Sequence, residues 1–345
     1  MAATPTPKPT PNRAAEEISA PAISVPFTPV AGNPASLALA ARAIDFPLPL
    51  GIAYSGGADS TALLFAAAER WPGQVQAIHI HHGLQACAGD FVRVCESVCA
   101  GLNLPLHVVH VDASHVSGES PEDAARRVRY AALGAAASNL SLKGVLLGQH
   151  ADDQVETLLL ALSRGAGLPG LAGMTAEFVR SGTTFYRPLL QVPAPSLRAW
   201  LVQQNIAFVD DPSNVDERFT RNRIRARLLP AIDEAFPQFR ETFARSARHA
   251  AQAQVLLSEV AAVDLRRIGS PLSIKALQGL SKVRQANLLR HWLLQTHQAT
   301  PSTAQLEQLL SQIVACTTRG HQIHLKIASG YVKRNGAVLS YALAE

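Results

Sequence analysis

The sequence predicts an α/β protein with a doubly wound parallel sheet and a second, smaller α/β domain. Apolar strand-like runs alternate with helical patterns from about residue 48 to residue 163, an order that is typical of a parallel sheet with helices on both faces. The chain has 345 residues, and domains average about 150 residues, so two domains are expected. Hydrophobic residues make up 48% and charged residues 17%, which is enough apolar material for a buried core.

The first 35 residues differ in composition from the remainder of the chain. They hold eight of the 22 prolines and no hydrophobic periodicity, which predicts a disordered, dispensable extension. We place a first domain at 36–240 and a second at 241–345. No run of about 20 apolar residues and no apolar signal core is found, so we expect a cytoplasmic protein that does not cross a membrane.

The first domain repeats a strand–helix unit. After a helix from about residue 36, an apolar strand over 48–54 leads through a glycine turn into a helix, TALLFAAAERW. The following strands and helices are QVQAIHIHHG, DFVRVCESVCAGLN, LHVVHVDA, PEDAARRVRYAALGAAASNL, GVLLGQH and DDQVETLLLALSR. Ligands of such sheets bind beyond the carboxyl ends of the strands, so SGGADS, HHG and GQHADD are expected along one rim.

The later part of the chain is more irregular and more basic. We expect short segments around 184–190, a helix over 196–205, a long helix carrying RNRIRARLLP, and a final hairpin turning at Asn335 and Gly336. Residues 241–345 contain 12 Lys and Arg against 5 Asp and Glu, whereas 1–240 contain 19 against 21. This gradient indicates a polyanionic partner for the second half, with a merely solvated basic face as the alternative.

The SGGADS segment is a candidate phosphate-binding loop. Gly56 and Gly57 let backbone N–H groups converge at a helix N-terminus, and Ser55 and Ser60 add hydroxyls. Asp59 suits a magnesium ion that bridges phosphates. The predicted ATP loop therefore comprises Ser55, Gly56, Gly57, Ala58, Asp59 and Ser60. The alternative is a plain glycine turn with a capping serine.

Five motifs in order resemble one family. SGGADS resembles the SGGxDS of the PP-loop ATP pyrophosphatases, and the others resemble the tRNA(Ile)-lysidine synthases. These are HIHHGLQ at 79–85, EDAARRVRY at 122–130, GQHADDQVET at 148–157 and DPSNVDERFTRNRIRARLLP at 211–230. Gln85 departs from the family's arginine and Gln149 from its first histidine.

The resemblance implies a PP-loop fold, a basic tRNA-binding second domain and a two-step ligation. ATP, with Mg²⁺, adenylates the C2 oxygen of the wobble cytidine in the CAU anticodon of isoleucine tRNA and releases pyrophosphate. The side-chain amine of L-lysine then displaces AMP and leaves lysidine. ATP, lysine and this tRNA are the expected partners, and a homodimer is left open.

The residues present suit both steps. Arg126 and Arg129, three apart on a helix, share a face and match phosphate oxygens. Asp153 and Glu156, also three apart, are expected to bind the lysine ammonium, while a carboxylate or His150 accepts its proton. Surface ion pairs and helix N-terminal carboxylates are the structural alternatives.

The remaining expected roles concern adenine and tRNA. By resemblance, the backbone of His79 and Ile80 lies beside the adenine. A three-histidine metal site is not expected there, because His79 and His81 point to one side of the strand and His82 to the other. Arg221 is expected to contact lysine as well as tRNA, and the other residues expected to contact tRNA are Arg225, Arg245 and Arg248.

Three alternatives compete with this interpretation. A tRNA thiolase requires catalytic or cluster-binding cysteines, but the four cysteines form no CxxC pair and are expected to be reduced and mostly buried. An amidotransferase-type synthetase requires a glutaminase domain or an ammonia source. A non-enzymatic ATP sensor or RNA adaptor needs neither the DDQVET carboxylates nor the RNRIR segment.

Overall fold

The computed structural model describes residues 32–41, 46–81, 88–111, 121–318 and 320–343. Most of the predicted extension over 1–35 therefore lies outside the described residues, and so does His82. The chain divides into two compact units, Met1–Glu156 with Thr175–Glu241, and Thr157–Met174 with Thr242–Glu345. The segment Thr157–Met174, which groups with the second unit, was not anticipated from the sequence.

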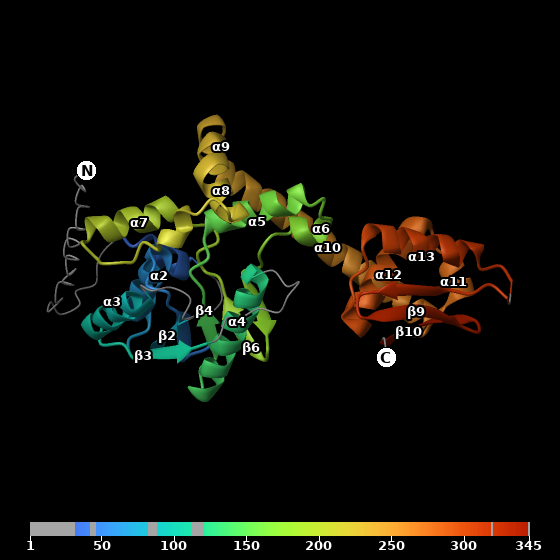
Figure 1. The fold of residues 1–345 in the computed structure, drawn as a ribbon, viewed down its shortest axis with the longest axis horizontal. Helices are drawn as coiled ribbons and strands as arrows, with labels where there is room; N and C mark the ends of the chain where they lie inside the picture. Colours follow the sequence, from blue (N-terminus) through green and yellow to red (C-terminus); the bar gives the residue numbers. More distant parts are fainter. Residues whose placement is uncertain (1–31, 42–45, 82–87, 112–120, 319, 344–345) are drawn as a thin grey trace, which may run out of the picture. The chain divides into compact units, whose positions relative to one another are not determined.

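A six-stranded sheet forms the centre of the first unit, in the order β3-β2-β1-β4-β6-β5 (Figure 1). Its strands are β1 (Leu50–Ala53), β2 (Val75–His81), β3 (Leu106–His110), β4 (Gly144–Leu146), β5 (Glu177–Arg180) and β6 (Thr183–Tyr186). The chain passes from β1 outward to β3 and then returns to β4 on the other side of β1. The strand order therefore reverses between β1 and β4, where doubly wound sheets bind ligands.

The edge strand β5 departs from the predicted parallel sheet. It runs antiparallel to β6, with Arg180 opposite Thr183. Ser181 and Gly182 between them have φ values of +51° and +77°, which is the conformation of a two-residue hairpin turn. This hairpin adds an antiparallel edge to an otherwise parallel sheet.

Helices cover both faces of the sheet, as predicted. The helices of the first unit include α1 (Pro34–Ala40), α2 (Ala58–Arg70), α3 (Ala88–Gly101), α4 (Pro121–Asn139), the start of α5 (Ala151–Ser163) and α7 (Ala194–Gln203). One core joins α1, α2, α3 and α7 to the sheet, and a second core joins α4 to it. These two layers hold the sheet rigid, so that loops beyond its strand ends keep a defined geometry.

The basic segment RNRIRARLLP is helical, as its sequence pattern predicts, but the helix is irregular and contains a π-helical turn. After a short 3₁₀ turn (Pro212–Val215), it forms α8 (Thr220–Arg223), a π-helical turn (Ile224–Leu228) and α9 (Leu229–Ala235). Pro230 has no N–H to donate to the preceding turn, and such prolines interrupt helices. The long helix is the next one, α10 (Phe239–Ile268).

The second unit is a small antiparallel sheet covered by helices. Strands β7 (Leu272–Ser273), β8 (His324–Ile327), β9 (Gly330–Asn335) and β10 (Val338–Leu343) pair in the order β7-β10-β9-β8. Its helices are α6 (Leu168–Leu171), most of α10, α11 (Ile274–Gln278), α12 (Lys282–His297) and α13 (Thr303–Ala315). The β9–β10 hairpin turns at Gly336, with Asn335 opposite Val338, as predicted.

Candidate active site

The phosphate loop follows β1 and is held by its own hydroxyl groups. The backbone N–H of Ser55 donates to Ser60 Oγ at 3.2 Å, and Ser60 Oγ donates to the Gly57 carbonyl at 3.0 Å. Gly56 has φ +84°, and a Cβ there would lie 3.1 Å from Cys95 Sγ. Glycine is therefore required both by the backbone angle and by the close thiol.

Helix α2 begins at Ala58, directly after this loop. Gly57 caps the helix without a side-chain hydrogen bond, and Asp59 lies in the first turn. The first N–H groups of a helix have no partner within the helix, and the N-terminus carries positive potential. This end of α2 is thus suited to phosphate oxygens, in agreement with the geometry expected of Ala58, Asp59 and Ser60.

The β4–α5 loop lies directly against this helix N-terminus. A Cβ on Gly148 would meet Ser60 N at 3.1 Å and Ser60 Cα at 3.2 Å, so only glycine lets the two loops approach this closely. The contact places His150 and the first turn of α5 beside Asp59. Two segments separated by about ninety residues therefore form one rim.

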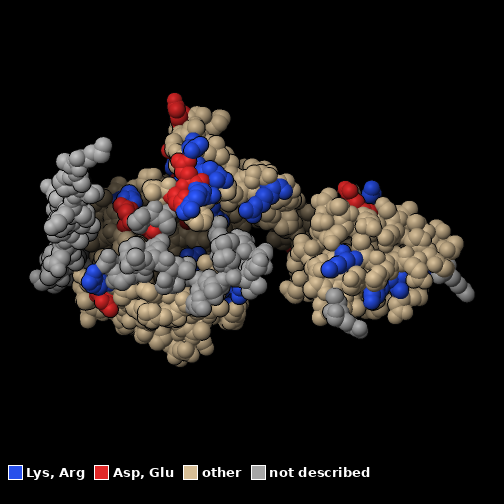
Figure 2. Space-filling view, in the orientation of Figure 1, with Lys and Arg blue, Asp and Glu red and all other residues tan. Residues whose placement is uncertain are grey.

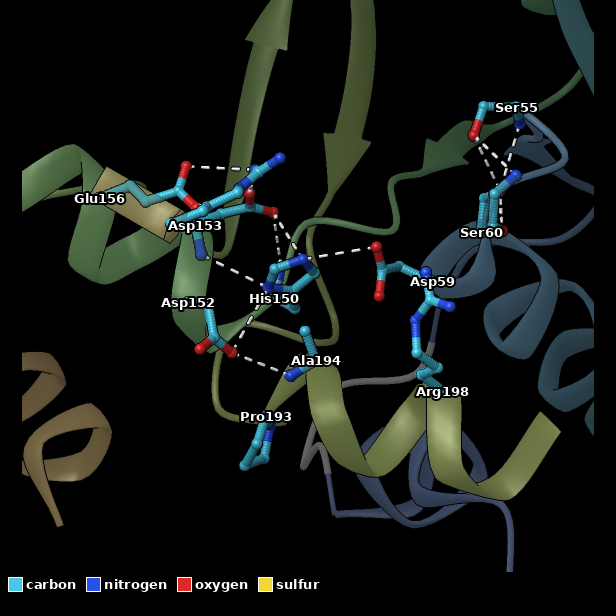
Figure 3. Close-up of polar contacts among 12 residues, drawn as sticks. Ser55, Asp59, Ser60, His150, Asp152, Asp153, Glu156, Pro193, Ala194 and Arg198 are labelled. Atoms are coloured by element: carbon cyan, nitrogen blue, oxygen red, sulfur yellow. Dashed lines mark hydrogen bonds and ion pairs between the residues drawn. The ribbon is translucent and has the colours of Figure 1, made fainter. Parts of the chain in front are cut away.

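His150 connects the two loops through three carboxylates (Figure 3). Its Nε2 lies 3.4 Å from both Asp59 Oδ2 and Asp153 Oδ2, and its Nδ1 lies 3.8 Å from Asp152 Oδ2. Burial alone would lower the pKa of His150, but the carboxylates of Asp153, Asp59 and Asp152 outweigh burial and raise it to about 9. The three carboxylates therefore favour the protonated form of His150 in the substrate-free protein at neutral pH.

The raised pKa of His150 gives its contribution to stability a definite pH dependence. A folded-state pKa of about 9, against about 6.5 in the unfolded chain, contributes up to about 3 kcal/mol. This contribution is fully present below about pH 6.5 and is lost as the pH rises through 9. We expect the difference in unfolding free energy between wild type and His150→Gln, measured with urea in EDTA without ATP, to shrink over that interval; a constant difference would contradict the assignment.

Glu156 lies one turn further along α5 and binds arginine. Its side chain is 0% exposed, and Arg225 Nε and Nη2 reach its two oxygens at 2.5 Å and 3.1 Å. Arg225 Nη2 also donates to Asp153 Oδ1 at 2.9 Å, and Arg221 Nη1 lies 3.7 Å from Glu156 Oε2. The pair Asp153 and Glu156 is therefore a site that already holds a cation.

Burial and neighbouring charges shift the pKa values of the groups that form this cation site. Burial raises the pKa of Glu156, and the hydrogen bond and charge of Arg225 partly offset this rise. Burial alone would lower the pKa of Arg225, but Glu156 and Asp153 outweigh it and raise the pKa. A carboxylate with a raised pKa is a better proton acceptor than an ordinary surface carboxylate.

Further arginines surround the same rim. Desolvation lowers the pKa of Arg129, and the charges of Arg126 and Arg221 add to this effect, while Tyr130 and Asp153 oppose it. The guanidinium of Arg126 lies 5.7 Å from the Tyr130 ring centre. Arg126 and Arg129, predicted from their spacing to serve phosphate, thus belong to the same electrostatic environment as the carboxylates of α5.

Two arginines that sequence analysis did not single out also contribute. Arg198 on α7 forms a bidentate ion pair with Asp210 and interacts electrostatically with Asp59. Arg240 Nε donates to Asp152 Oδ1 at 2.8 Å. Single arginines outside a motif carry no sequence signal, so only the tertiary structure brings them to the rim.

The other predicted site residues are placed as follows. His79 is buried, its Nδ1 donates to the Tyr54 carbonyl at 2.9 Å, and desolvation lowers its pKa, so its ring supports the core and not a ligand. Ile80 lies next to it in β2, paired with Val109 of β3. Arg245 and Arg248 are exposed on α10 in the second unit. Within the described part of the chain, no group of three or more metal-ligating side chains is found.

The described cysteines are buried, as predicted. They are Cys95, Cys99 and Cys316, and all are free thiols; Cys87 lies outside the described residues. Desolvation raises the pKa of both Cys95 and Cys99 to about 12, which makes them poor nucleophiles at neutral pH. Separately, no helix within the described ranges combines the length and apolarity that crossing a membrane requires.

Comparison with known proteins agrees with this geometry. The model of the PP-loop domain matches residues 47–232, and the model of the TilS substrate binding domain matches residues 272–336. A tRNA(Ile)-lysidine synthase from Polaromonas naphthalenivorans is 70% identical over 319 residues, which cover 91% of this chain and 97% of the relative. The chain belongs to the tRNA(Ile)-lysidine synthase family.

Other relatives in the family differ in length. The synthase from Bordetella pertussis is 37% identical over 84% of this chain and 94% of its own length. The synthase from Burkholderia pseudomallei is 40% identical over 81% of this chain, but only 59% of the relative is covered. The fold alone is shared with a U34-tRNA thiolase from Methanococcus maripaludis, at a TM-score of 0.53 and 13% identity over 62% of this chain and 76% of the thiolase.

The structure also accounts for Gln149, which departs from the family's usual histidine. Arg187, 5% exposed, donates from Nε to Gln149 Oε1 and from Nη1 to the Thr175 carbonyl at 2.8 Å. Its guanidinium lies 4.1 Å from the ring centre of Phe178. Gln149 is thus an acceptor for a buried cation in this synthase.

Removal of this cation is expected to destabilise the fold. Arg187→Met keeps the length of the side chain but leaves Gln149 Oε1 and the Thr175 carbonyl without their shared donor, so we expect the unfolding free energy to fall by about 2–4 kcal/mol. Urea unfolding monitored by circular dichroism measures the effect. Arg164→Met, at an exposed side chain, is the matched control and is expected to change it by less than about 1 kcal/mol; equal losses in both variants would refute the special role of Arg187.

Proposed function

We propose that this synthase ligates L-lysine to C2 of the wobble cytidine in the CAU anticodon of isoleucine tRNA. The C2 oxygen attacks the α-phosphorus of ATP and pyrophosphate leaves; the side-chain amine of lysine then attacks C2, the C2–O bond breaks and AMP leaves. The amine loses a proton in the second step. Membership of the family supports this reaction, and we propose that it takes place in the cytoplasm, where tRNA and ATP are found.

The observation that carries the proposal is the contact between the two loops. The phosphate loop ends at Asp59, and the α5 carboxylates begin beyond His150, whose Nε2 is 3.4 Å from Asp59 and from Asp153. The first step requires positioning of phosphates and neutralisation of their charge. The second requires a carboxylate site for an ammonium group, and both sites lie side by side on one rim.

Asp59 fits the magnesium ion that this chemistry implies. Its side chain is 36% exposed at the helix N-terminus, and magnesium is typically held by one or two carboxylates together with substrate phosphates. When bound, the ion neutralises charge on the phosphates. The chain itself supplies the N–H groups of the loop and the guanidinium groups of Arg126 and Arg129 for the remaining oxygens.

Arg225 marks where we place the lysine ammonium. Asp153 and Glu156 hold the guanidinium of Arg225 in the substrate-free structure, which supports their assignment as a cation site. Because the neighbouring carboxylates favour the protonated form of His150 in this state, we assign the proton acceptor to a carboxylate of α5. Arg221, 3.7 Å from Glu156, is placed to hold either that carboxylate or the carboxylate of lysine.

The test is incorporation of radiolabelled lysine into tRNA by the purified full chain. ATP, magnesium and an unmodified isoleucine tRNA with CAU are supplied, and a transcript with GAU is the control. Labelling that depends on cytidine, with AMP and pyrophosphate released, is the expected result. Binding of ATP without labelling would refute the proposal and would turn attention to other acceptors of PP-loop enzymes.

A further inference from the structure

One face of the sheet in the second unit is left uncovered by its helices. Leu325, Ile327 and Val332 point into the core against α12 and α13, so the alternate residues of β8 and β9 point outward. Four of these outward residues form a patch, which we name the β8–β9 patch: His324, Lys326, Tyr331 and Lys333.

The pairing register brings the four side chains of the β8–β9 patch together. His324 lies opposite Lys333, and Lys326 lies opposite Tyr331. The rings of His324 and Tyr331 are stacked, with 4.6 Å between centroids and 6° between planes, and Lys333 Nζ lies 5.6 Å from the Tyr331 ring centre. The result is a flat aromatic surface with an ammonium group on each strand.

This part of the chain carries only positive charge. Residues 308–344 contain no Asp or Glu, and they contain Arg319, Lys326, Lys333 and Arg334. Figure 2 shows basic side chains over the region where Figure 1 labels β9 and β10. Arg334 is used internally, since its guanidinium donates to three backbone carbonyls, whereas His324, Lys326 and Lys333 are exposed.

We propose that the β8–β9 patch is a tRNA contact surface, in which Lys326 and Lys333 bind phosphates and the His324–Tyr331 ring pair stacks on a base or ribose. Cross-strand ring pairing alone explains the two rings, but the flanking ammonium groups, in a stretch of sequence that has no Asp or Glu over 308–344, match the way proteins bind RNA backbones and unpaired bases. The inference rests on the proposed function, because it names the surface through which the same tRNA is held.

The β8–β9 patch supplies affinity and not chemistry. A phosphate contact contributes to binding in a salt-dependent way, with a slope of roughly 0.7–0.9 per contact in a plot of log affinity against log salt. Loss of both lysines is therefore expected to weaken tRNA binding, to reduce that slope by about 1.5 and to raise the KM for tRNA. The kcat at saturating tRNA and the KM values for ATP and lysine are expected to stay within about twofold.

The test compares full-length Lys326→Ala/Lys333→Ala with Lys275→Ala/Lys282→Ala. The second pair removes the same charge from exposed lysines of α11 and α12 in the same unit. Filter binding of the CAU isoleucine tRNA at several salt concentrations gives affinity and slope. We expect about a tenfold loss of affinity for the first pair and less than a twofold change for the second.

A second pair of variants tests stacking separately from charge. Tyr331→Leu is expected to weaken tRNA binding at least about fivefold, and Tyr331→Phe to retain wild-type binding, since the ring is kept. Thermal unfolding of each variant shows whether the unit remains folded. If Leu and Phe variants bind alike, the stacking role is wrong.

The outcomes separate this inference from the proposed function. Equal tRNA affinity of both double lysine variants overturns the β8–β9 patch, whether or not lysidine is formed. A selective loss for Lys326→Ala/Lys333→Ala supports it, even if the wild-type protein incorporates no lysine. Unchanged tRNA binding together with lost binding to vesicles of anionic phospholipid would assign the surface to a membrane and overturn the proposal.

Discussion

Replacement of Asp59 by asparagine is expected to lower the rate of pyrophosphate release by about a hundredfold to a thousandfold. Asp59 lies in the first turn of α2 beside the phosphate loop, and its Oδ2 is 3.4 Å from His150 Nε2. Asparagine keeps the size of the side chain but removes the charge that a magnesium ion requires, and loss of one electrostatic stabiliser of a transition state has an effect of this order. Because the Asp59 side chain is partly exposed, the fold should be retained.

Pyrophosphate release with saturating tRNA and ATP, in the absence of lysine, measures this effect directly. Glu69→Gln is the matched control, because Glu69 lies near the end of the same helix and accepts a hydrogen bond from Ser36 Oγ at 3.1 Å. We expect the control to retain wild-type turnover. Retention of more than a tenth of wild-type activity by Asp59→Asn would show that Asp59 does not hold the metal.

Glu156→Gln is expected to separate the two half-reactions. The wild-type carboxylate is fully buried and is bound by Arg225, so a neutral amide leaves the cation site with one negative charge fewer. We expect the KM for lysine to rise by about a hundredfold or more, while pyrophosphate release without lysine stays within about threefold of wild type. A variant that lost both activities equally would place Glu156 in the adenylation step.

The stability of Glu156→Gln must be measured together with its activity, because the substitution breaks a buried ion pair. Removal of one partner of such a pair costs about 3 kcal/mol or more, and thermal unfolding shows whether Glu156→Gln still folds. Asp153→Asn, at a side chain that is 15% exposed, tests the same site with less strain. Glu177→Gln on the exposed edge strand β5 is the control and is expected to leave the KM for lysine unchanged.

The alternation of strands and helices was sufficient to predict the doubly wound sheet. Apolar runs that end at SGGADS and GQHADD are local features of the sequence, and the rule that ligands lie beyond the carboxyl ends of parallel strands placed both motifs on one rim. The antiparallel edge strand β5 was not predicted, for a local reason. Ser181 and Gly182 turn a short segment back on itself, and a two-residue turn is a weak signal outside a clear strand pattern.

The helical pattern predicted a helix over RNRIRARLLP, and residues 220–235 are helical, but the pattern did not predict the π-helical turn upstream of Pro230. The interruption upstream of this proline produces a π-helical turn, and this turn carries Arg225. The sequence placed Arg225 among the candidates for contact with tRNA phosphate. In the structure the guanidinium of Arg225 donates hydrogen bonds to Asp153 and Glu156, which are the carboxylates expected to bind the lysine ammonium.

The sequence by itself determined the family, the fold class and the chemical types in the site, because each depends on motifs that are contiguous in the chain. Only the tertiary structure decided how the motifs meet. Residues that are far apart in sequence meet at four places. Gly148 contacts the start of α2, and His150 lies between three carboxylates. Glu156 is buried beneath Arg225, and Arg187 donates to Gln149. Charges and pKa values depend on the distances and burial that such packing sets, and spacing along a chain does not specify either of them.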